Sequence, residues 1–244
     1  MLYGRFEGTM TAATTVPSKK ASSRIPLTLV VALVPAAAAL NIVGGYINNA
    51  LHLPIFLDMI GTCVAAIVLG PWWGALVGVI TNVGGSFFTG PIGIPFALAN
   101  VAGALVWGYG VRSWGMGRNQ VTYFLLNILV ALAVSAAAAP IVIFVFGGAT
   151  GHSSDALTAA FAQAGRDLVT AVFASNVIVS LADKIIAGYI GLAIIAALPA
   201  NLTAGITLPA QSPMKAVLSA VVGIVIGVGL VLVYLLILAP SPTA

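Results

Sequence analysis

The sequence predicts an all-α fold, a polytopic bundle of membrane-spanning helices. Of its 244 residues, 61% are hydrophobic and 6% are charged, whereas about a quarter of the residues in an average soluble domain are charged. A soluble fold needs polar residues on its outer faces, so it cannot hide long uncharged segments. A membrane span takes ~20 apolar residues, which predicts about six or seven helices within the uncharged stretches. These stretches cover residues 25–57, 59–111, 119–154, 185–214 and 216–244.

The composition also argues against other classes of protein. The apolar stretches are continuous, whereas the strands of a membrane β-barrel alternate apolar and polar residues. The formal net charge is +4, but most basic residues flank hydrophobic segments, where they set membrane topology. We therefore expect no nucleic-acid partner. The single cysteine, Cys63, cannot form an intrachain disulfide.

The N-terminal region is expected to consist of a tail and a first helix. Residues 1–24 are rich in Thr and Ser and indicate a mobile cytoplasmic tail. The first helix is expected over about 26–48, followed by a polar patch at 46–52. A signal peptide with a cleavage site near 36–38 is the alternative. An uncleaved helix is favoured because the apolar pattern continues to Ile47.

The second and third helices are expected over about 55–69 and 74–88. Pro54, Gly70-Pro71 and the break at 89–95 bound them, because helices do not easily continue through such residues. Each has fifteen residues between its breakers. At 1.5 Å per residue this gives ~22 Å, less than the ~30 Å hydrocarbon core. Their ends should therefore continue into loops that are buried or line a cavity.

Four more helices follow, separated by polar connections and by proline. The connections cover 112–120 and 147–166, and Pro199 stops the sixth helix before a loop over 200–213. The fourth helix is expected from the break at 89–95 to residue 109. The fifth, sixth and seventh helices are expected over 121–146, 168–198 and 214–238.

The basic residues predict the orientation. With the N-terminus in the cytoplasm, only Arg166 lies outside, and Lys184 lies within a helix. This asymmetry predicts a cytoplasmic N-terminus and, with seven helices, an external C-terminus. The cytoplasmic basic residues would be Arg5, Lys19, Lys20, Arg24, Arg112, Arg118 and Lys215.

A candidate ligand site lies at the predicted outer face. Three segments should meet there: 46–58, 87–95 and 147–167. The first combines aromatic rings with neutral hydrogen-bonding groups, a mixture that suits a small heterocycle. The alternative is an ordinary polar loop solvated at the membrane interface. The candidate binding residues are Tyr46, Asn48, Asn49, His52, Phe56 and Asp58.

Three ionisable residues lie deep in apolar segments: Asp58, Asp183 and Lys184. Such groups cost several kcal/mol unless they are paired or hydrated, so each is a functional candidate. Adjacent helical residues point about 100° apart, so Asp183 and Lys184 are not expected to satisfy each other. An ion pair between Asp58 and Lys184 is the working hypothesis, with a structural or a ligand-contacting role equally open.

Polar and small residues recur in the other apolar segments. Asn100 and Asn176 are candidates to face the same outer cavity, whereas Asn82 and Asn127 are expected to join helices by hydrogen bonds. Small residues four apart allow close helix packing, and packing within the chain is favoured over a partner surface. Such pairs are Ala32 and Ala36, Gly74 and Gly78, and Gly223 and Gly227.

No motif indicates an enzyme. The sequence has no G-x-x-x-x-G-K-[ST], H-E-x-x-H or G-x-S-x-G pattern, and its acidic residues form no obvious catalytic pair. One cysteine and two histidines offer little for a metal site. We therefore expect no catalytic residues, no cofactor and no metal, and a protein that binds or conducts.

Parts of the chain resemble the substrate-binding (S) components of energy-coupling factor (ECF) transporters. The matching stretches are ALNIVGGYI at 39–47, LPIFLDMIGT at 53–62 and LGPWWGALVG at 69–78. Ser175-Asn176, residues 181–184 and the stop at Pro199 look like the final helix of that family. The resemblance covers residues 25–199 in order.

The resemblance implies a six-helix bundle over 25–199 that captures a vitamin or similar micronutrient near the outer face of a prokaryotic cell membrane. The loop over 46–56 would cap the pocket. A membrane coupling subunit with two ATPase subunits would be the partner, and toppling of the S component would deliver the substrate inward. Ala32 and Ala36 match the small residues that meet the coupling subunit.

The chain departs from this family in residues 200–244, a loop plus a seventh hydrophobic segment. The additional helix puts the docking mechanism in doubt more than ligand binding. The alternative function is a membrane sensor or scaffold that engages a partner through this helix. An ion-coupled carrier that uses Asp58 and Asp183 is a third hypothesis, although no internal repeat supports it.

Overall fold

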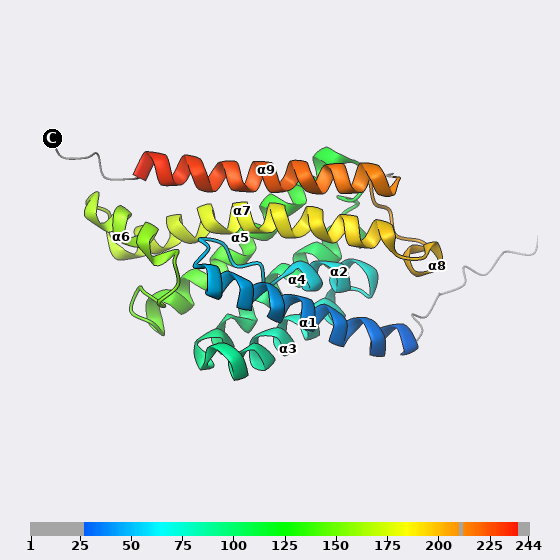
Figure 1. Cartoon of the computed structure of the whole chain (residues 1–244), viewed down its shortest axis with the longest axis horizontal. Coiled ribbons are helices and arrows are strands. Elements are labelled where there is room, and N and C mark those ends of the chain that lie inside the picture. The colour runs from blue at the N-terminus through cyan, green and yellow to red at the C-terminus, as the bar shows by residue number, and fades with distance from the viewer. Residues whose placement is uncertain (1–26, 210–211, 239–244) are drawn as a thin grey trace, which may run out of the picture.

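The computed structural model describes residues 27–209 and 212–238, whose regular elements are all helices (Figure 1). The expected tail, residues 1–24, lies outside the described residues, as do four of the basic residues that predict the orientation. The elements are α1 (Leu27–Leu51), α2 (Ile60–Val68), α3 (Pro71–Thr89), the 3₁₀ helix η1 (Pro91–Phe96), α4 (Ala97–Arg112), α5 (Gln120–Phe144), α6 (Asp155–Gln163), α7 (Leu168–Ala197), α8 (Ala200–Thr203) and α9 (Pro213–Leu238).

The fold is a helical membrane bundle. Five helical segments in the described part of the chain are long and apolar enough to cross a membrane. The expectation of six or seven spans is not confirmed, because α2 has nine residues and α3 is not among these five segments. The five segments are Leu27–Leu51, Pro91–Arg112, Gln120–Phe144, Leu168–Ala197 and Met214–Val233.

Local sequence signals account for several helix ends. The Asn119 side chain accepts a hydrogen bond from Thr122 N at 2.9 Å and caps α5. Asp167 caps α7 in the same way, through Thr170 N at 3.0 Å. Such side chains satisfy amide groups that have no partner within the helix. As predicted, α7 ends before Pro199.

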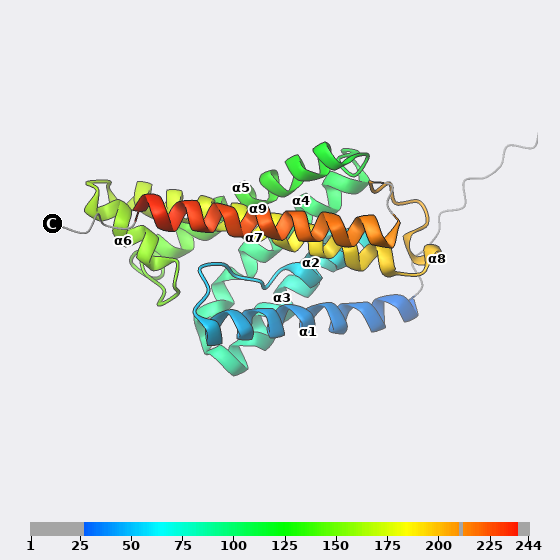
Figure 2. The same cartoon turned by 45° about the horizontal axis from the view of Figure 1, so that its top comes forward.

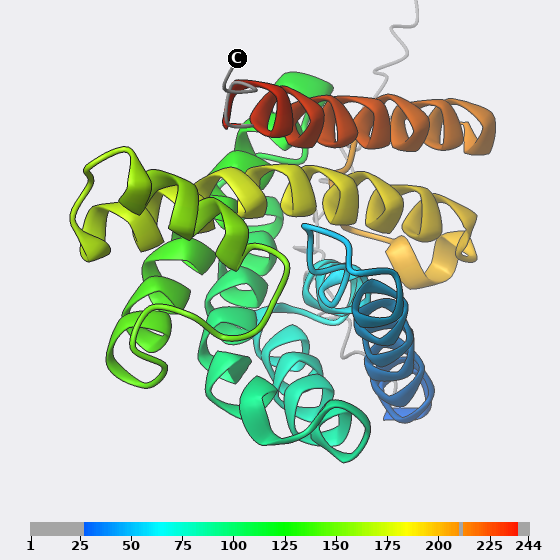
Figure 3. The ribbon, with the colours of Figure 1, turned by 60° about the vertical axis from the view of Figure 1, so that its left-hand side comes forward.

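The helix α9 and the helix α1 lie on different sides of the bundle. α9 lies along α7, while α1 and α3 lie on the other side of the bundle (Figures 1 and 2). Figure 3 shows the same separation of α9 from α1 after rotation. Gly223 and Gly227 let α9 approach α7, because a Cβ atom on them would come within 2.7 Å of Tyr189 Cβ and 2.9 Å of Ala182 O, respectively.

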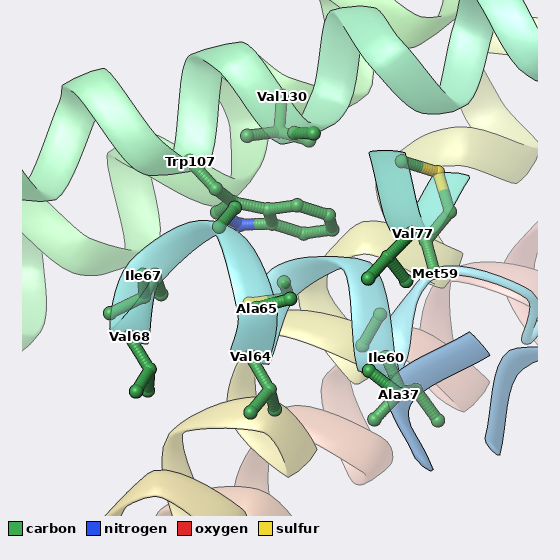
Figure 4. Packing of buried hydrophobic residues seen from close by; sticks show 14 of the residues in the cluster. Ala37, Met59, Ile60, Val64, Ala65, Ile67, Val68, Val77, Trp107 and Val130 are labelled. Atoms are coloured by element: carbon green, nitrogen blue, oxygen red, sulfur yellow. The ribbon is translucent and has the colours of Figure 1, made fainter. Parts of the chain in front are cut away.

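The core is built around α2, all nine residues of which are buried. Its apolar side chains contact α1, α3, α4 and α7. The Trp107 ring, which is fully buried, lies between α2 and Val130 of α5 (Figure 4). Gly61 permits a close crossing of α1 and α2, because a Cβ atom there would lie 2.6 Å from the Ala37 carbonyl carbon. A helix too short to cross the bilayer is thus held by surrounding protein.

Two expected boundaries in this region are wrong. The polar patch at 46–52 is not a loop, because α1 continues to Leu51. The second helix does not begin at residue 55, because residues 53–59 are non-helical. Leu57 has a φ of 57°, a left-handed conformation that interrupts a right-handed helix. Asp58 therefore lies in a loop before α2 rather than within a helix.

The C-terminal end of α2 is capped by Arg112, the last residue of α4. Arg112 Nε donates to Ile67 O at 3.1 Å, and its Nη2 donates to Val68 O at 2.6 Å. These carbonyl groups are at the C-terminus of α2, where a positive charge is favourable. A residue expected only to set topology therefore also holds the central helix.

Replacing Arg112 with Met should lower the free energy of unfolding by about 1–2 kcal/mol, because two carbonyl groups lose charged donors. Thermal unfolding of the detergent-solubilised protein would measure the effect. Arg118→Met is the matched control, since the Arg118 side chain donates no hydrogen bond within the described chain. Equal effects of the two changes would contradict the capping role.

Candidate functional site

A cavity of about 380 Å³ lies at the end of the bundle where α1, α3 and α5 finish and α4 and α7 begin. Two connections cover it: the loop before α2 (53–59) and the loop before α6 (147–154). The η1 helix contributes a third side. The three segments expected to meet at one face thus surround a single cavity.

Most candidate binding residues line this cavity. His52 does not, because it is exposed at the end of α1 with a φ of 51°. Tyr46 and Asn49 are exposed at the rim, whereas Asn48 and Asn100 are buried. The structure places seven of the candidates around the cavity: Tyr46, Asn48, Asn49, Phe56, Asp58, Asn100 and Asn176.

A chain of buried polar groups runs from the cavity wall into the bundle. Asn100 Nδ2 donates to Asp58 Oδ2 at 3.3 Å, and Thr62 Oγ1 donates to Asn100 Oδ1 at 2.8 Å. Asn41 Nδ2 then donates to Thr62 Oγ1 at 2.8 Å and to Thr81 Oγ1 at 3.0 Å. These bonds tie Asp58 to helices α1, α2, α3 and α4, so the carboxylate is held in place.

The predicted ion pair between Asp58 and Lys184 is not formed. Lys184 Nζ instead pairs with Oδ2 of its neighbour Asp183, and both side chains are almost fully buried. The expectation that adjacent residues could not satisfy each other is wrong, because the long lysine side chain bends back to the carboxylate. Lys184 Nζ also lies 5.6 Å from the centre of the Phe56 ring.

Asp183 also fixes the loop that covers the cavity. Its Oδ1 accepts hydrogen bonds from Phe56 N at 3.1 Å and Leu57 N at 2.8 Å. Gly44 allows this loop to lie against α1, because a Cβ atom there would overlap the Leu57 carbonyl oxygen. One buried carboxylate thus stabilises the loop and neutralises Lys184.

His152 connects the two covering loops. Its ring stacks on Phe56 with centroids 4.8 Å apart, and its Nε2 lies 2.9 Å from Asn48 Nδ2. Ser154 N donates to His152 Nδ1 at 3.1 Å. Burial lowers the pKa of His152 below its ordinary value, so the ring is uncharged near pH 7.

The loop that carries His152 is shaped by Asp155, the first residue of α6. Asp155 Oδ2 accepts hydrogen bonds from Thr150 N and Gly151 N, both at 2.7 Å. Gly151 has a φ of 84°, a conformation that favours glycine. The carboxylate therefore turns Thr150–His152 toward the cavity, which all three residues line.

Sequence reasoning missed several cavity residues. Asn41 and Thr81 are buried polar residues in apolar segments, the pattern that singles out Asn100, and this signal could have found them. His152 was considered only for metal binding. No sequence feature marks Ser180 as a cavity residue, because a serine in a membrane helix can bond to the backbone of its own helix.

Two buried polar atoms at the cavity have no hydrogen-bond partner within the described residues: Asn48 Oδ1 and Ser180 Oγ. Buried polar groups are nearly always paired, so such atoms indicate a site for water or ligand. The described residues contain no cluster of three metal-ligating side chains. The arrangement suits non-covalent binding of a small molecule between amides, aromatic rings and one carboxylate.

The candidate partner residues lie away from the cavity. Ala32 and Ala36 are exposed on one face of α1, and α9 lies on the other side of the bundle (Figure 3). In comparisons with known proteins, no family model, curated protein or solved structure matches this chain.

Proposed function

We propose that this chain is the membrane-embedded substrate-binding subunit of an ECF-type importer. It captures a vitamin-like solute at the outer face, and separate coupling and ATPase subunits drive uptake. The observation that carries the proposal is the 380 Å³ cavity at one end of the bundle, with its two covering loops. Small-molecule sites are typically concave, mostly apolar and provided with a few placed polar groups.

The chemistry of the cavity supports capture rather than passage. Its floor contains the hydrogen-bonded chain from Asp58 to Thr81, which crosses the middle of the bundle. Below it, α2 is fully buried, and its apolar residues belong to the hydrophobic core. A solute that enters from the outer end therefore meets a closed floor, so its release on the other side requires a further conformational step.

Docking to a coupling subunit is compatible with the exposed small residues of α1. Ala32 and Ala36 leave a face over which another helix can approach closely. The seventh hydrophobic segment, α9, packs against α7 and leaves this face open. The additional helix therefore does not argue against docking through α1.

The alternative is a sensor or scaffold that engages a partner through α9. Gly223 and Gly227 already pack against α7, so this pair gives no support to an external partner. A carrier coupled to ions through Asp58 and Asp183 is less favoured, because Asp183 is engaged by Lys184 and by two backbone amides.

Mass spectrometry of small molecules that co-purify with the detergent-solubilised protein tests the proposal. We expect one compound in near-stoichiometric amount, and its loss from a Tyr46→Ala, Asn49→Ala double variant, whose changes lie at the exposed rim. Leu51→Ala is the matched control, since Leu51 is exposed on the same helix but does not line the cavity. If only lipid is found in all samples, the scaffold hypothesis becomes the better one.

A further inference from the structure

Three asparagine amides that line the cavity already donate hydrogen bonds within the protein. Asn82 Nδ2 donates to Gly78 O at 2.9 Å, and Asn176 Nδ2 donates to Val172 O at 3.0 Å. A carbonyl partner requires the NH₂ group, so these bonds fix which way each amide points. Asn100 Nδ2 is likewise engaged, with Asp58 Oδ2 at 3.3 Å.

Several oxygen atoms at the cavity receive no hydrogen bond within the described part of the chain. The amide oxygens of Asn82 and Asn176 receive no hydrogen bond from any described residue, and neither does Asp58 Oδ1. Ser180 Oγ is fully buried and unpartnered, and the Asn48 amide leaves one buried atom unpartnered as well. The oxygen atoms of Asn82, Asn176 and Asp58 are thus open to donors from a ligand, and the Ser180 hydroxyl can donate or accept.

The charged groups at the cavity are only partly paired. Asp183 and Lys184 neutralise each other, while Asp58 has one hydrogen bond from a neutral amide and no cation within ion-pair distance in the described chain. Burial lowers the pKa of His152 and keeps its ring uncharged, and Asp155 holds the covering loop through Thr150 N. Asp58 is thus the acidic side chain that lines the cavity, and it has no salt-bridge partner among the described residues, whereas Lys184, which also lines the cavity, is paired with Asp183.

We infer that the ligand is a small organic cation whose N–H groups donate to Asp58 and to the free amide oxygens, with an apolar or aromatic body between the rings. This inference rests on the proposed function and names its substrate class. A positively charged donor supplies both what the acceptors lack and the counter-ion that the buried Asp58 needs.

Three probes of nearly equal shape separate charge from size: benzamidinium, benzamide and benzoate. Each is titrated to about 10 mM, a range suited to weak fragment binding, and thermal unfolding of the intact protein in detergent is followed. We expect benzamidinium to stabilise the protein most and benzoate least.

Two variants test the role of Asp58. In Asp58→Asn, which keeps the shape of the side chain, benzamidinium should bind at least tenfold more weakly. Asp167→Asn removes a carboxylate at the start of α7, away from the cavity, and should bind benzamidinium as wild type does.

The outcomes separate this inference from the proposed function. Protection by benzoate or benzamide equal to that by benzamidinium overturns the inference but leaves a small-molecule site. Unchanged benzamidinium binding in Asp58→Asn also overturns it. Absence of protection by all three probes, together with no co-purifying compound, counts against both. If Asp58→Asn fails to fold, the order of the three probes on the wild-type protein decides.

Discussion

Replacing Asp183 with Ala should be among the most destabilising single changes in this chain, with a loss of about 3–5 kcal/mol in the free energy of unfolding. The carboxylate is fully buried and accepts three hydrogen bonds, from Lys184, Phe56 and Leu57. Without it, the buried lysine keeps its charge with no partner, and two amide groups of the covering loop lose their acceptor. Breaking a buried pair in this way costs more than the pair itself contributes.

The effect of the unpaired lysine charge can be separated from the loss of packing by a second substitution. In the Asp183→Ala, Lys184→Met double variant no unpaired charge remains, so part of the stability should return. Thermal unfolding and susceptibility of the 53–59 loop to limited proteolysis would measure the two consequences. Asp167→Asn is the control, because Asn also caps helices well. If the single and double variants are equally unstable, the unpaired lysine is not the cause.

The pattern of apolar segments predicted the long helices well, because length and hydropathy in a membrane protein leave few alternatives. The expected segments 121–146 and 168–198 correspond to α5 and α7 within two residues at each end. The region 46–69 was predicted less well. Its conformation depends on Asp183, more than a hundred residues away, which binds the amides of Phe56 and Leu57, and no local signal reports such a contact.

The candidate site was likewise predicted only in part, because its contacts join segments that are distant in the sequence. Residue types alone placed amides, aromatics and one carboxylate near one face, and the structure brings seven of these residues around one cavity. The pairing of the charged residues was wrong because it treated helical direction as decisive, whereas a lysine side chain is long enough to reach its neighbour. His152 was missed because its role depends on stacking with Phe56, a contact between distant segments.

Replacing Gly61 with Ala should disturb the centre of the bundle, with an expected loss of about 3 kcal/mol. The added Cβ atom would lie 2.6 Å from the carbonyl carbon and 2.8 Å from the Cα atom of Ala37. These are backbone atoms of α1, so no side-chain rotation can relieve the overlap, and α1 and α2 must separate. Gly61 N also donates to Asn41 Oδ1 at 2.6 Å, so the separation would break the polar chain that holds Asp58.

The matched control is Gly229→Ala on α9, where the added atom meets nothing within 4 Å. There the higher helix propensity of alanine should leave stability unchanged or raise it by up to about 1 kcal/mol. Thermal unfolding compares the two variants, and ligand binding should fall only in Gly61→Ala, because Asp58 loses its support. Equal stability of the two variants would mean that α1 and α2 do not cross this closely. Loss of stability without loss of binding would mean that the polar chain does not position Asp58.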